Sequence, residues 1–503
     1  MKMKIRKQIL AVVAALMIPW AGWSQIIETD DPLMPDIRPS KDSLMQHIND
    51  LTSGTYRGRL AGTPSYMAAA QYVADVLQSY GLRPFQGSYI QNFEMDCNQI
   101  EGCTFNVYNM RDNSFRTLVL GSDFVCGGKT GVAFTSGQAV FCGYGMDHEN
   151  YDEYQGMELH DRIAVVLSGV PKFLPSSMTR DYATLRDKAL VAQRHGANAL
   201  VVINLDTCCK ADEVLGQVWM GEGEFQKNFP VILTTQICGS QLLESEPTGL
   251  NEAIAQINQN RRPHSFIMDQ KFELKVYADH NVKSPTANVV AYLPGAERPE
   301  NREYVVIGAH LDHVGMQGES CMFPGADDNA SGVAAVMEVA RMLTMTRIPP
   351  QRNVVFVFFA GAENQHEGSL VFLQKFKKLK YLEAFVNGEC LGAGDSLVVK
   401  GEEMYPLLYE IADSADRKYN HIMTHTAPTS PDGDAAHFAE IGIPSIVVTT
   451  SNGKKHNHVI EDIPEYIDID MVAEGTKLMF ETIYRLSDGI YRGRSIRSRA
   501  YRF

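Results

Sequence analysis

The chain has 503 residues, of which 45% are hydrophobic and 21% are charged, and its formal net charge is −14. This composition is typical of globular proteins, and the length favours two or three domains because one hydrophobic core rarely organises so many residues. The acidic balance argues against nucleic acid as a partner, since a phosphate-binding surface needs an excess of lysine and arginine.

Residues 1–24 have the pattern of a secretory signal, with a basic start, an apolar run over Ile9–Ile18 and a small residue, Gly22, near the end. A membrane anchor is the alternative, but the run is short for a span of about 20 residues and is followed by Pro19. We therefore expect an exported protein with a periplasmic or extracellular location and no stable membrane insertion. The basic tail at 491–503 is expected to be a solvated terminus, and the oligomeric state is left open.

Nine cysteines are present, and seven of them fall within one third of the chain: Cys97, Cys103, Cys126, Cys142, Cys208, Cys209 and Cys238. In an oxidising compartment this density makes one to three disulfides plausible, with a pairing that the sequence does not give. Cys321 and Cys390 stand apart, and we interpret both as packing residues.

The first part of the mature chain, 25–101, contains two helical patterns, at 42–51 and 68–82, and Gly81 suits the end of the second. The stretch 102–275 differs, because short β-type runs dominate it at 104–109, 138–145, 162–169, 199–205 and 230–235. One helical pattern, at 185–197, interrupts them. Three fragments of this stretch, at 140–145, 161–171 and 188–203, resemble the protease-associated domain. The resemblance implies an inserted β-rich lid or docking surface without catalytic residues, and a generic α/β insertion is the alternative.

From 276 to 490, apolar runs alternate with helical patterns. The runs lie at 288–293, 304–311, 354–361, 384–389 and 443–450, and the helical patterns lie at 330–343, 366–379 and 403–418. Near-continuous β-branched and aromatic runs are typical of strands that are buried on both faces. The alternation predicts an α/β fold with a doubly wound, mostly parallel sheet, whose ligands gather at the carboxyl ends of the strands.

Residues with metal-binding side chains occur where these strands end. His310 ends one run, Glu363 and Glu389 follow two others, Asp327 precedes a helix, and His458 follows the last run. Asp312, two residues after His310, is placed to orient that imidazole. Two imidazoles and three carboxylates suit zinc best, although cobalt or manganese would accept the same ligands.

With these motifs the chain resembles metallopeptidase clan MH, family twenty-eight, whose members are co-catalytic zinc aminopeptidases and carboxypeptidases of the zinc exopeptidase fold. The resemblance covers about 42–487 and implies two zinc ions and a peptide substrate. It further implies that His310 and Glu389 serve one ion, that Glu363 and His458 serve the other, that Asp327 bridges them, and that Asp312 holds His310.

Two positions depart from that family. Its strand-end motif normally has two adjacent glutamates, a general base and then a ligand, whereas this chain has Ala362 before Glu363. Glu389 stands where the family usually has aspartate. Glu367 and His366 are candidate proton acceptors in place of the missing carboxylate. A shifted register would make Glu363 the base and Asn364 the ligand, which is disfavoured because an amide oxygen binds zinc weakly.

The sequence therefore supports a secreted zinc exopeptidase, with aminopeptidase action as the favoured interpretation. Ala362 supports a rival, a peptidase-fold binding protein that performs no hydrolysis, and a glutaminyl cyclase-like enzyme is a third interpretation. His313, His437 and His456 are expected to be structural or to orient ligands, and the segment 430–437 is a candidate wall of a substrate pocket.

Overall fold

The computed structural model describes residues 37–205, 227–296, 303–346, 348–419, 421, 423–452, 457–489 and 491. The expected signal at 1–24, Cys208, Cys209, His456 and the tail beyond 491 lie outside these residues. All helices and strands described below belong to the compact unit Arg38–Phe503. None of the described helices combines the length and the hydropathy that a membrane crossing requires.

A mixed sheet of 14 strands runs through this unit. At one end the parallel strands are β12 (Tyr304–His310), β15 (Asn353–Phe359), β16 (Leu382–Gly388) and β18 (Ser445–Thr450), with β17 (Leu397–Lys400) antiparallel at the edge. Every residue of these four parallel strands is buried, which explains their near-continuous apolar sequences. We call this end the metal-site half.

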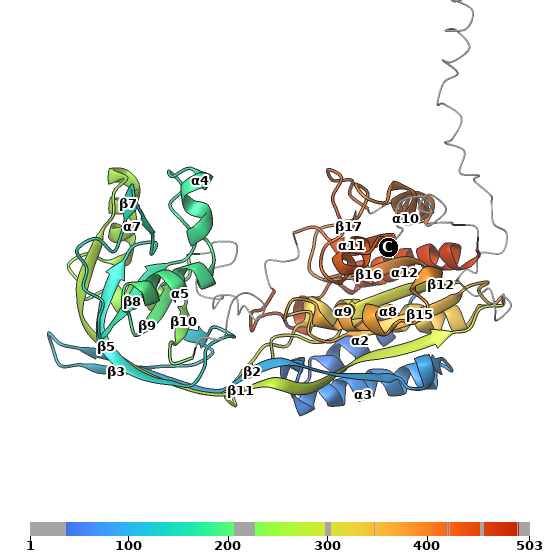
Figure 1. Cartoon of the computed structure of the whole chain (residues 1–503), viewed down its shortest axis with the longest axis horizontal. Helices are drawn as coiled ribbons and strands as arrows, with labels where there is room; N and C mark the ends of the chain where they lie inside the picture. The colour runs from blue at the N-terminus through green and yellow to red at the C-terminus, as the bar shows by residue number, and fades with distance from the viewer. Residues whose placement is uncertain are drawn as a thin grey trace, which may run out of the picture. The chain divides into compact units, whose positions relative to one another are not determined.

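Helices cover both faces of the metal-site half (Figure 1). α8 (Gly332–Thr344) and α12 (Ile469–Ser487) contact β12 and β16. On the other face, Val306 and Phe359 of the strands share a core with Phe372 of α9 (Glu367–Lys375) and Phe438 of α11 (Asp434–Glu440). The expected doubly wound α/β fold is confirmed.

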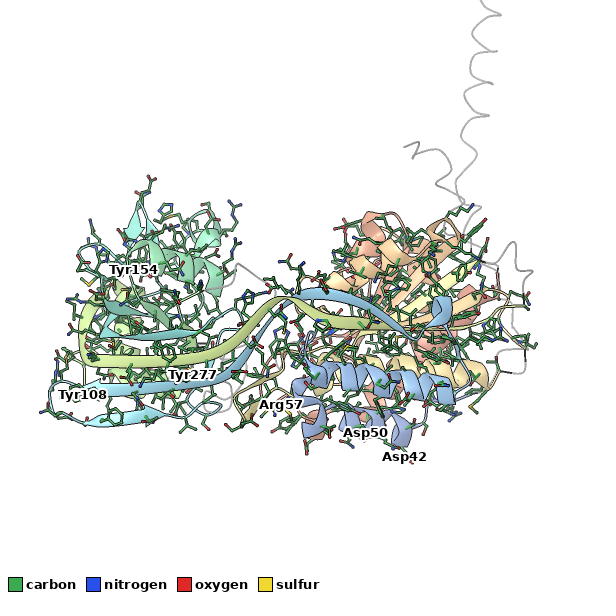
Figure 2. The ribbon with its side chains drawn as sticks, turned by 60° about the horizontal axis from the view of Figure 1, so that its bottom comes forward. Asp42, Asp50, Arg57, Tyr108, Tyr154 and Tyr277 are labelled. Atoms are coloured by element: carbon green, nitrogen blue, oxygen red, sulfur yellow. The ribbon has the colours of Figure 1, made fainter. Side chains whose placement is uncertain are left out.

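Both expected N-terminal helices are present, and the second begins four residues before the expected position and ends three residues before it. α2 (Lys41–Leu51) begins after Ser40, whose side chain accepts a hydrogen bond from the Ser43 N–H. α3 (Pro64–Ser79) begins after Thr63 and stops before Gly81, which has a φ of 82°. Both helices contact α8, and Figure 2 labels Asp42 and Asp50 on α2. Another helix, α10 (Pro406–Tyr419), contacts α12.

Two long antiparallel strands, β2 (Ile90–Asn109) and β11 (Ser265–Leu293), form a continuous ribbon between the two ends of the sheet (Figures 1 and 2). β11 pairs with β15 through its last residues and with β5 (Ala133–Cys142) through its first. The boundaries expected at 101/102 and 275/276 therefore fall inside strands rather than in linkers.

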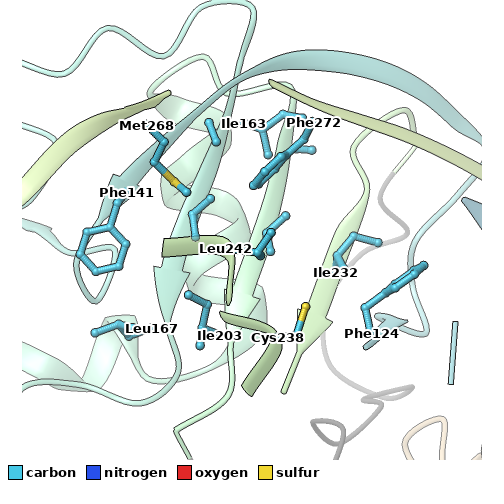
Figure 3. Close-up of a cluster of buried hydrophobic side chains, with 14 of the residues drawn as sticks. Phe124, Phe141, Ile163, Leu167, Ile203, Ile232, Cys238, Leu242, Met268 and Phe272 are labelled. Atoms are coloured by element: carbon cyan, nitrogen blue, oxygen red, sulfur yellow. The ribbon is translucent and has the colours of Figure 1, made fainter. Parts of the chain in front are cut away.

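The other end of the sheet, the inserted half, continues from β5 through the parallel strands β8 (Arg162–Leu167), β9 (Ala199–Ile203) and β10 (Val231–Thr234). Its core joins these strands to α6 (Gln236–Leu243) and α7 (Leu250–Asn260), as the cluster around Phe141, Leu242 and Phe272 shows (Figure 3). α5 (Leu185–Arg194) covers the opposite face through Ala189 and Ala192. The resemblance to the protease-associated domain stays a prediction.

Short elements complete the described fold. The strands are β1 (Arg83–Pro84), β3 (Phe115–Leu118), β4 (Phe124–Cys126), β6 (Asp147–His148), β7 (Tyr151–Asp152), β13 (Met316–Gln317) and β14 (Cys321–Met322), and the remaining α-helix among the described residues is α4 (Ser176–Thr179), beside several 3-10 turns. The seven described cysteines are free thiols, and all except Cys103 are buried. Among these residues the expected disulfides are absent, because the thiols pack into the core as small apolar groups.

Candidate metal centre

Metal-binding side chains meet at the carboxyl edge of the metal-site half. His313, Asp328, Glu363 and His458 each offer one ligand atom, and these atoms lie within 4.8 Å of one another. His313 follows β12, Glu363 follows β15, His458 follows β18, and Asp328 lies in the turn Ala326–Ser331 before α8. The carboxyl ends of parallel strands share one edge of a sheet, so residues far apart in sequence converge there.

Asp328 stands at the middle of this group. Its Oδ1 lies 3.2 Å from His310 Nε2, and its Oδ2 lies 3.2 Å from His458 Nε2. The sequence assigned this bridging position to Asp327, and the structure corrects that assignment by one residue. The Asp327 carboxylate instead accepts hydrogen bonds from the Gly392 N–H at 2.6 Å and from the Ser331 hydroxyl at 3.3 Å.

A second acidic residue, Asp462, fixes the backbone of this turn. Its two carboxylate oxygens accept the N–H groups of Asp327 and Asp328 at 2.7 and 3.0 Å. Asp462 lies four residues after His458, so one segment provides a candidate ligand and also holds the turn that carries Asp328.

Glu363 contacts two imidazoles. Its Oε2 lies 2.8 Å from His458 Nε2, and its Oε1 lies 3.3 Å from His313 Nδ1. His313, expected to be structural or to orient a ligand, is fully buried and belongs to the group of four. Its Nδ1 also lies 3.9 Å from Asp328 Oδ2, so His313 faces both carboxylates of the group.

Asp312 supports Glu363 more directly than it supports His310. Its carboxylate accepts the N–H groups of Ala362 and Glu363 at 3.1 and 3.3 Å. His310 Nδ1 lies 3.1 Å from the backbone oxygen of Asp312 and 4.0 Å from the carboxylate. The expected orienting role is therefore carried out by the backbone, while the side chain fixes the turn after β15.

Glu389 lies in a neighbouring group with His366 and Asp434. The Asn387 side chain donates to Glu389 Oε2 at 3.3 Å, and His366 Nδ1 lies 3.6 Å from Asp434 Oδ1. A Cβ placed on Gly433 would lie 2.9 Å from Glu389 Oε2 and 3.7 Å from the His366 ring. The sequence grouped Glu389 with the other ligands, and the structure places it outside the group of four.

Glu367 has different charged neighbours. Burial and then Asp96 raise its pKa, and the Lys129 ammonium opposes them. Lys129 in turn donates to the Asn364 side chain at 2.9 Å, next to Glu363. The expected proton-accepting role of Glu367 stays a prediction without support from these contacts.

A buried arginine binds the loops that carry the ligands. Arg59 is fully buried and donates to the backbone oxygens of Leu311, Pro324 and Gly325 at 2.8–2.9 Å. Burial lowers the pKa of Arg59 to about 10, and the carboxylates of Asp462 and Asp328 oppose that shift. The positive charge of Arg59 offsets part of the negative charge of the site. No sequence pattern pointed to Arg59.

The donor atoms fit a divalent transition metal such as zinc. Imidazole nitrogens and carboxylate oxygens are its usual ligands, and here they are buried and face one another. Without a cation, protons on the imidazoles must balance the carboxylates. Burial alone would lower the pKa of His310, yet Asp328 and then Glu363 raise it to about 10.

Comparison with known proteins agrees with this geometry. Residues 288–483 match the model of Peptidase family M28. Leucine aminopeptidase 1 of Trichoderma harzianum is 27% identical over 246 residues, which cover 45% of this chain and 61% of the relative. The chain thus spans about three fifths of the length of that relative. It spans 55% of the length of a second leucine aminopeptidase 1, from Emericella nidulans.

Solved structures show the same fold. A zinc aminopeptidase from Bacillus subtilis has a TM-score of 0.65 at 17% identity, with 90% of this chain and 97% of that chain covered. A Peptidase M28 precursor from Shewanella amazonensis has a TM-score of 0.63 at 16% identity, with 90% and 99% covered. At these identities the likeness concerns the fold, which the order of the ligand-bearing strands already indicated. In sequence, residues 288–483 of this chain are similar to peptidase family M28.

Proposed function

We propose that this protein is an exported zinc-dependent exopeptidase of aminopeptidase type. One observation carries the proposal: the Asp328 carboxylate lies between His310 and His458, with Glu363 beside His458. The family match and the aminopeptidase names of the relatives support the choice of reaction. The structural neighbour from Bacillus subtilis, a zinc aminopeptidase, supports zinc as the metal.

Two zinc ions are proposed, with Asp328 shared between them. His310 and Glu389 would hold one ion, and Glu363 and His458 the other. Zinc there would polarise the peptide carbonyl and lower the pKa of a water molecule. The protein's own contribution is to fix Glu363 through Asp312 and to hold the Asp328 turn through Asp462, so that the ligands need little rearrangement.

Ala362 sets the expected level of activity. Its N–H is held by Asp312, but its methyl group offers no proton acceptor. General-base catalysis typically contributes about 100- to 10,000-fold, so this peptidase is proposed to be slow or to use another base. The same residue favours the second candidate function, a peptidase-fold protein that binds peptides without cleaving them.

Metal analysis and a substrate panel separate these functions. We expect near-stoichiometric zinc in the purified full chain, and chelator-sensitive release of N-terminal residues from aminoacyl substrates. Glu363→Gln is the matched control, expected to lose zinc and turnover together. Zinc without turnover would favour the binding protein, a folded protein without metal or turnover would contradict the peptidase, and cyclised glutaminyl peptides would favour the cyclase.

Export is part of the proposal and has its own test. The pattern of residues 1–24 supports it. N-terminal sequencing of the protein from its native host should find a chain that begins near residue 25. An intact first residue in the mature protein would contradict cleavage.

A further inference from the structure

The backbone after Glu363 takes an unusual path. Gln365 and His366 both have left-handed φ values, 63° and 55°, although neither is glycine. Side chains other than glycine rarely adopt this conformation, and such strain often accompanies function. The His366 N–H also donates to the Ala362 carbonyl at 3.3 Å. The turn therefore ties His366 to the residue where the family's carboxylate is missing.

His366 is paired with a buried carboxylate. Asp434, the first residue of α11, is 1% exposed, and its Oδ1 lies 3.6 Å from His366 Nδ1. The His366 side chain itself is 34% exposed, so one edge of the ring can reach a bound molecule. With Nδ1 directed to Asp434, Nε2 is the atom left for chemistry.

Gly433 lets this pair approach Glu389. Its φ is 59°, and a Cβ at this position would lie 2.9 Å from Glu389 Oε2 and 3.7 Å from His366 Cε1. Glu389 and the His366 ring therefore border the same small space, with only a glycine α-carbon beside them. This space adjoins Glu389, the residue proposed as a ligand of one zinc ion, so the His366 ring borders that candidate ligand.

The other titratable groups around His366 do not compete for Asp434. His437 makes an edge contact with the His366 ring at a centroid distance of 6.2 Å, but its Nδ1 lies 3.0 Å from the Ser369 hydroxyl. Burial alone would lower the pKa of His366, but Asp434 and then Glu389 raise it to about 9, and His310 opposes them. Asp434 is thus the dominant partner of His366.

We propose that His366, oriented by Asp434, is the proton acceptor of this enzyme in place of the carboxylate that Ala362 lacks. The proposal rests on the peptidase function proposed above. As the water oxygen bonds to the scissile carbonyl carbon, His366 Nε2 takes one proton from that water. When the C–N bond breaks, the proton passes to the leaving nitrogen, which departs as the new amino terminus, and His366 is neutral again.

The direct test compares His366→Gln with Glu367→Gln, its neighbour and matched control. In zinc-loaded full-length protein, His366→Gln should lower kcat at least 100-fold with KM within about threefold, because only proton transfer is lost. Glu367→Gln should stay within about threefold of the unmodified protein. Zinc content and melting temperature should be unchanged in both variants, which separates lost chemistry from lost structure.

A second set of variants addresses mechanism and folding. His366→Ala should recover turnover when free imidazole is added, and Ala362→Glu combined with His366→Gln should regain at least 10-fold in kcat. Asp434 is a positioning residue, so Asp434→Asn should lower kcat about 10-fold and move the acid limb of the kcat/KM profile to lower pH. In the metal-free protein, NMR of the histidine ring protons should show a lower pKa for His366 in Asp434→Asn.

The outcomes distinguish the two proposals. An active protein whose turnover survives His366→Gln with full zinc content overturns the role of His366 and leaves the peptidase function standing. A zinc-loaded unmodified protein without turnover on any peptide overturns both. Loss of turnover in Glu367→Gln but not in His366→Gln would transfer the role to Glu367.

Discussion

The two halves of the sheet bury charged side chains in different ways. In the inserted half, Glu153 accepts the Tyr144 N–H at 2.8 Å, and Lys188 donates to the Tyr144 carbonyl at 2.5 Å. In the metal-site half, Asp328 faces the imidazole of His458 at 3.2 Å. The partners of Glu153 and Lys188 are mainly backbone groups, whereas the carboxylate of Asp328 faces other titratable side chains.

This difference indicates which buried charges belong to the fold and which belong to a site. Burial raises the pKa of Glu153 to about 7 and lowers that of Lys188 to about 8, so both pay for desolvation but need no ligand. In the metal-site half, carboxylates face imidazoles, so the net charge of the site depends on the protons or the cation that it binds. Variants in the two halves should therefore fail in different ways.

The largest effect is expected at Asp328. Asp328→Asn removes the carboxylate between His310 and His458, and zinc affinity should fall more than 100-fold, beyond the usual effect of a residue that only supports a ligand. Asp327→Asn is the matched control, because it changes the adjacent residue and should retain most of the zinc. Chelator competition with elemental analysis gives the affinities, and a larger loss in Asp327→Asn would restore the sequence-based assignment.

In the inserted half, Lys188→Met should lower the stability of the fold without changing the zinc content. The Tyr144 and Gly169 carbonyls lose their donor and Glu153 loses a nearby cation, so the free energy of unfolding should drop by about 2–5 kcal/mol. Glu153→Gln keeps an acceptor for the Tyr144 N–H and should cost less. Denaturant unfolding with zinc analysis measures both quantities. A loss of zinc in Lys188→Met would contradict the claim that the two halves are independent.

Ala362→Glu adds a carboxylate to the metal-site half, at the position where the general base is missing. Restored general-base catalysis should raise kcat by roughly 10-fold or more at unchanged zinc content. Steady-state kinetics of the variant beside the unmodified protein gives the ratio. If kcat does not rise while zinc is fully bound, the idea of a peptidase that lacks only its general base is wrong.

Glu481 in α12 offers an internal control whose effect depends on pH. It is a buried carboxyl of the metal-site half outside the ligand group, and burial raises its pKa to about 8. The unfolded chain ionises near the ordinary value of 4.5, so the stability that protonated Glu481 contributes is lost as pH rises from about 4.5 to 8.

Glu481→Gln should remove this dependence. At pH 4.5 the variant and the unmodified protein should have nearly the same free energy of unfolding. From there to pH 8 the free energy of unfolding of the variant should exceed that of the unmodified protein by an amount that grows by at most about 1.4 kcal/mol per pH unit. Thermal unfolding at several pH values measures the difference. An advantage that is independent of pH would show that Glu481 is ionised in the folded protein.

The fold was predictable because buried parallel strands have a strong sequence pattern. The runs at 304–311 and 354–361 match β12 and β15 within two residues at either end. The boundaries of the inserted half were not predictable, because β2 and β11 have 20 and 29 residues and pass through both halves, and even Pro285 and the register shift between Asn281 and Ser284 do not end β11. A continuous strand gives no sequence mark where its surroundings change.

The site was predictable in part, for a related reason. His310, Glu363 and His458 follow strands, and strand ends are visible in sequence. The choice between Asp327 and Asp328 was not predictable, because it depends on the Gly392 N–H, which donates to Asp327, and on the Asp462 carboxylate, which accepts the Asp328 N–H. Gly392 lies 65 residues from Asp327, and Asp462 lies 134 residues from Asp328. The pairing of His366 with Asp434 likewise joins two loops that no local pattern connects.

The central claim is that Asp328 is the shared ligand of a zinc centre, and anomalous scattering tests it most directly. A crystal of the zinc-loaded full chain, measured on both sides of the zinc absorption edge, should show two peaks on opposite sides of the Asp328 carboxylate. One peak should contact His310 and the other His458. Peaks beside Asp327, or none near these residues in a well-ordered crystal, would contradict the account.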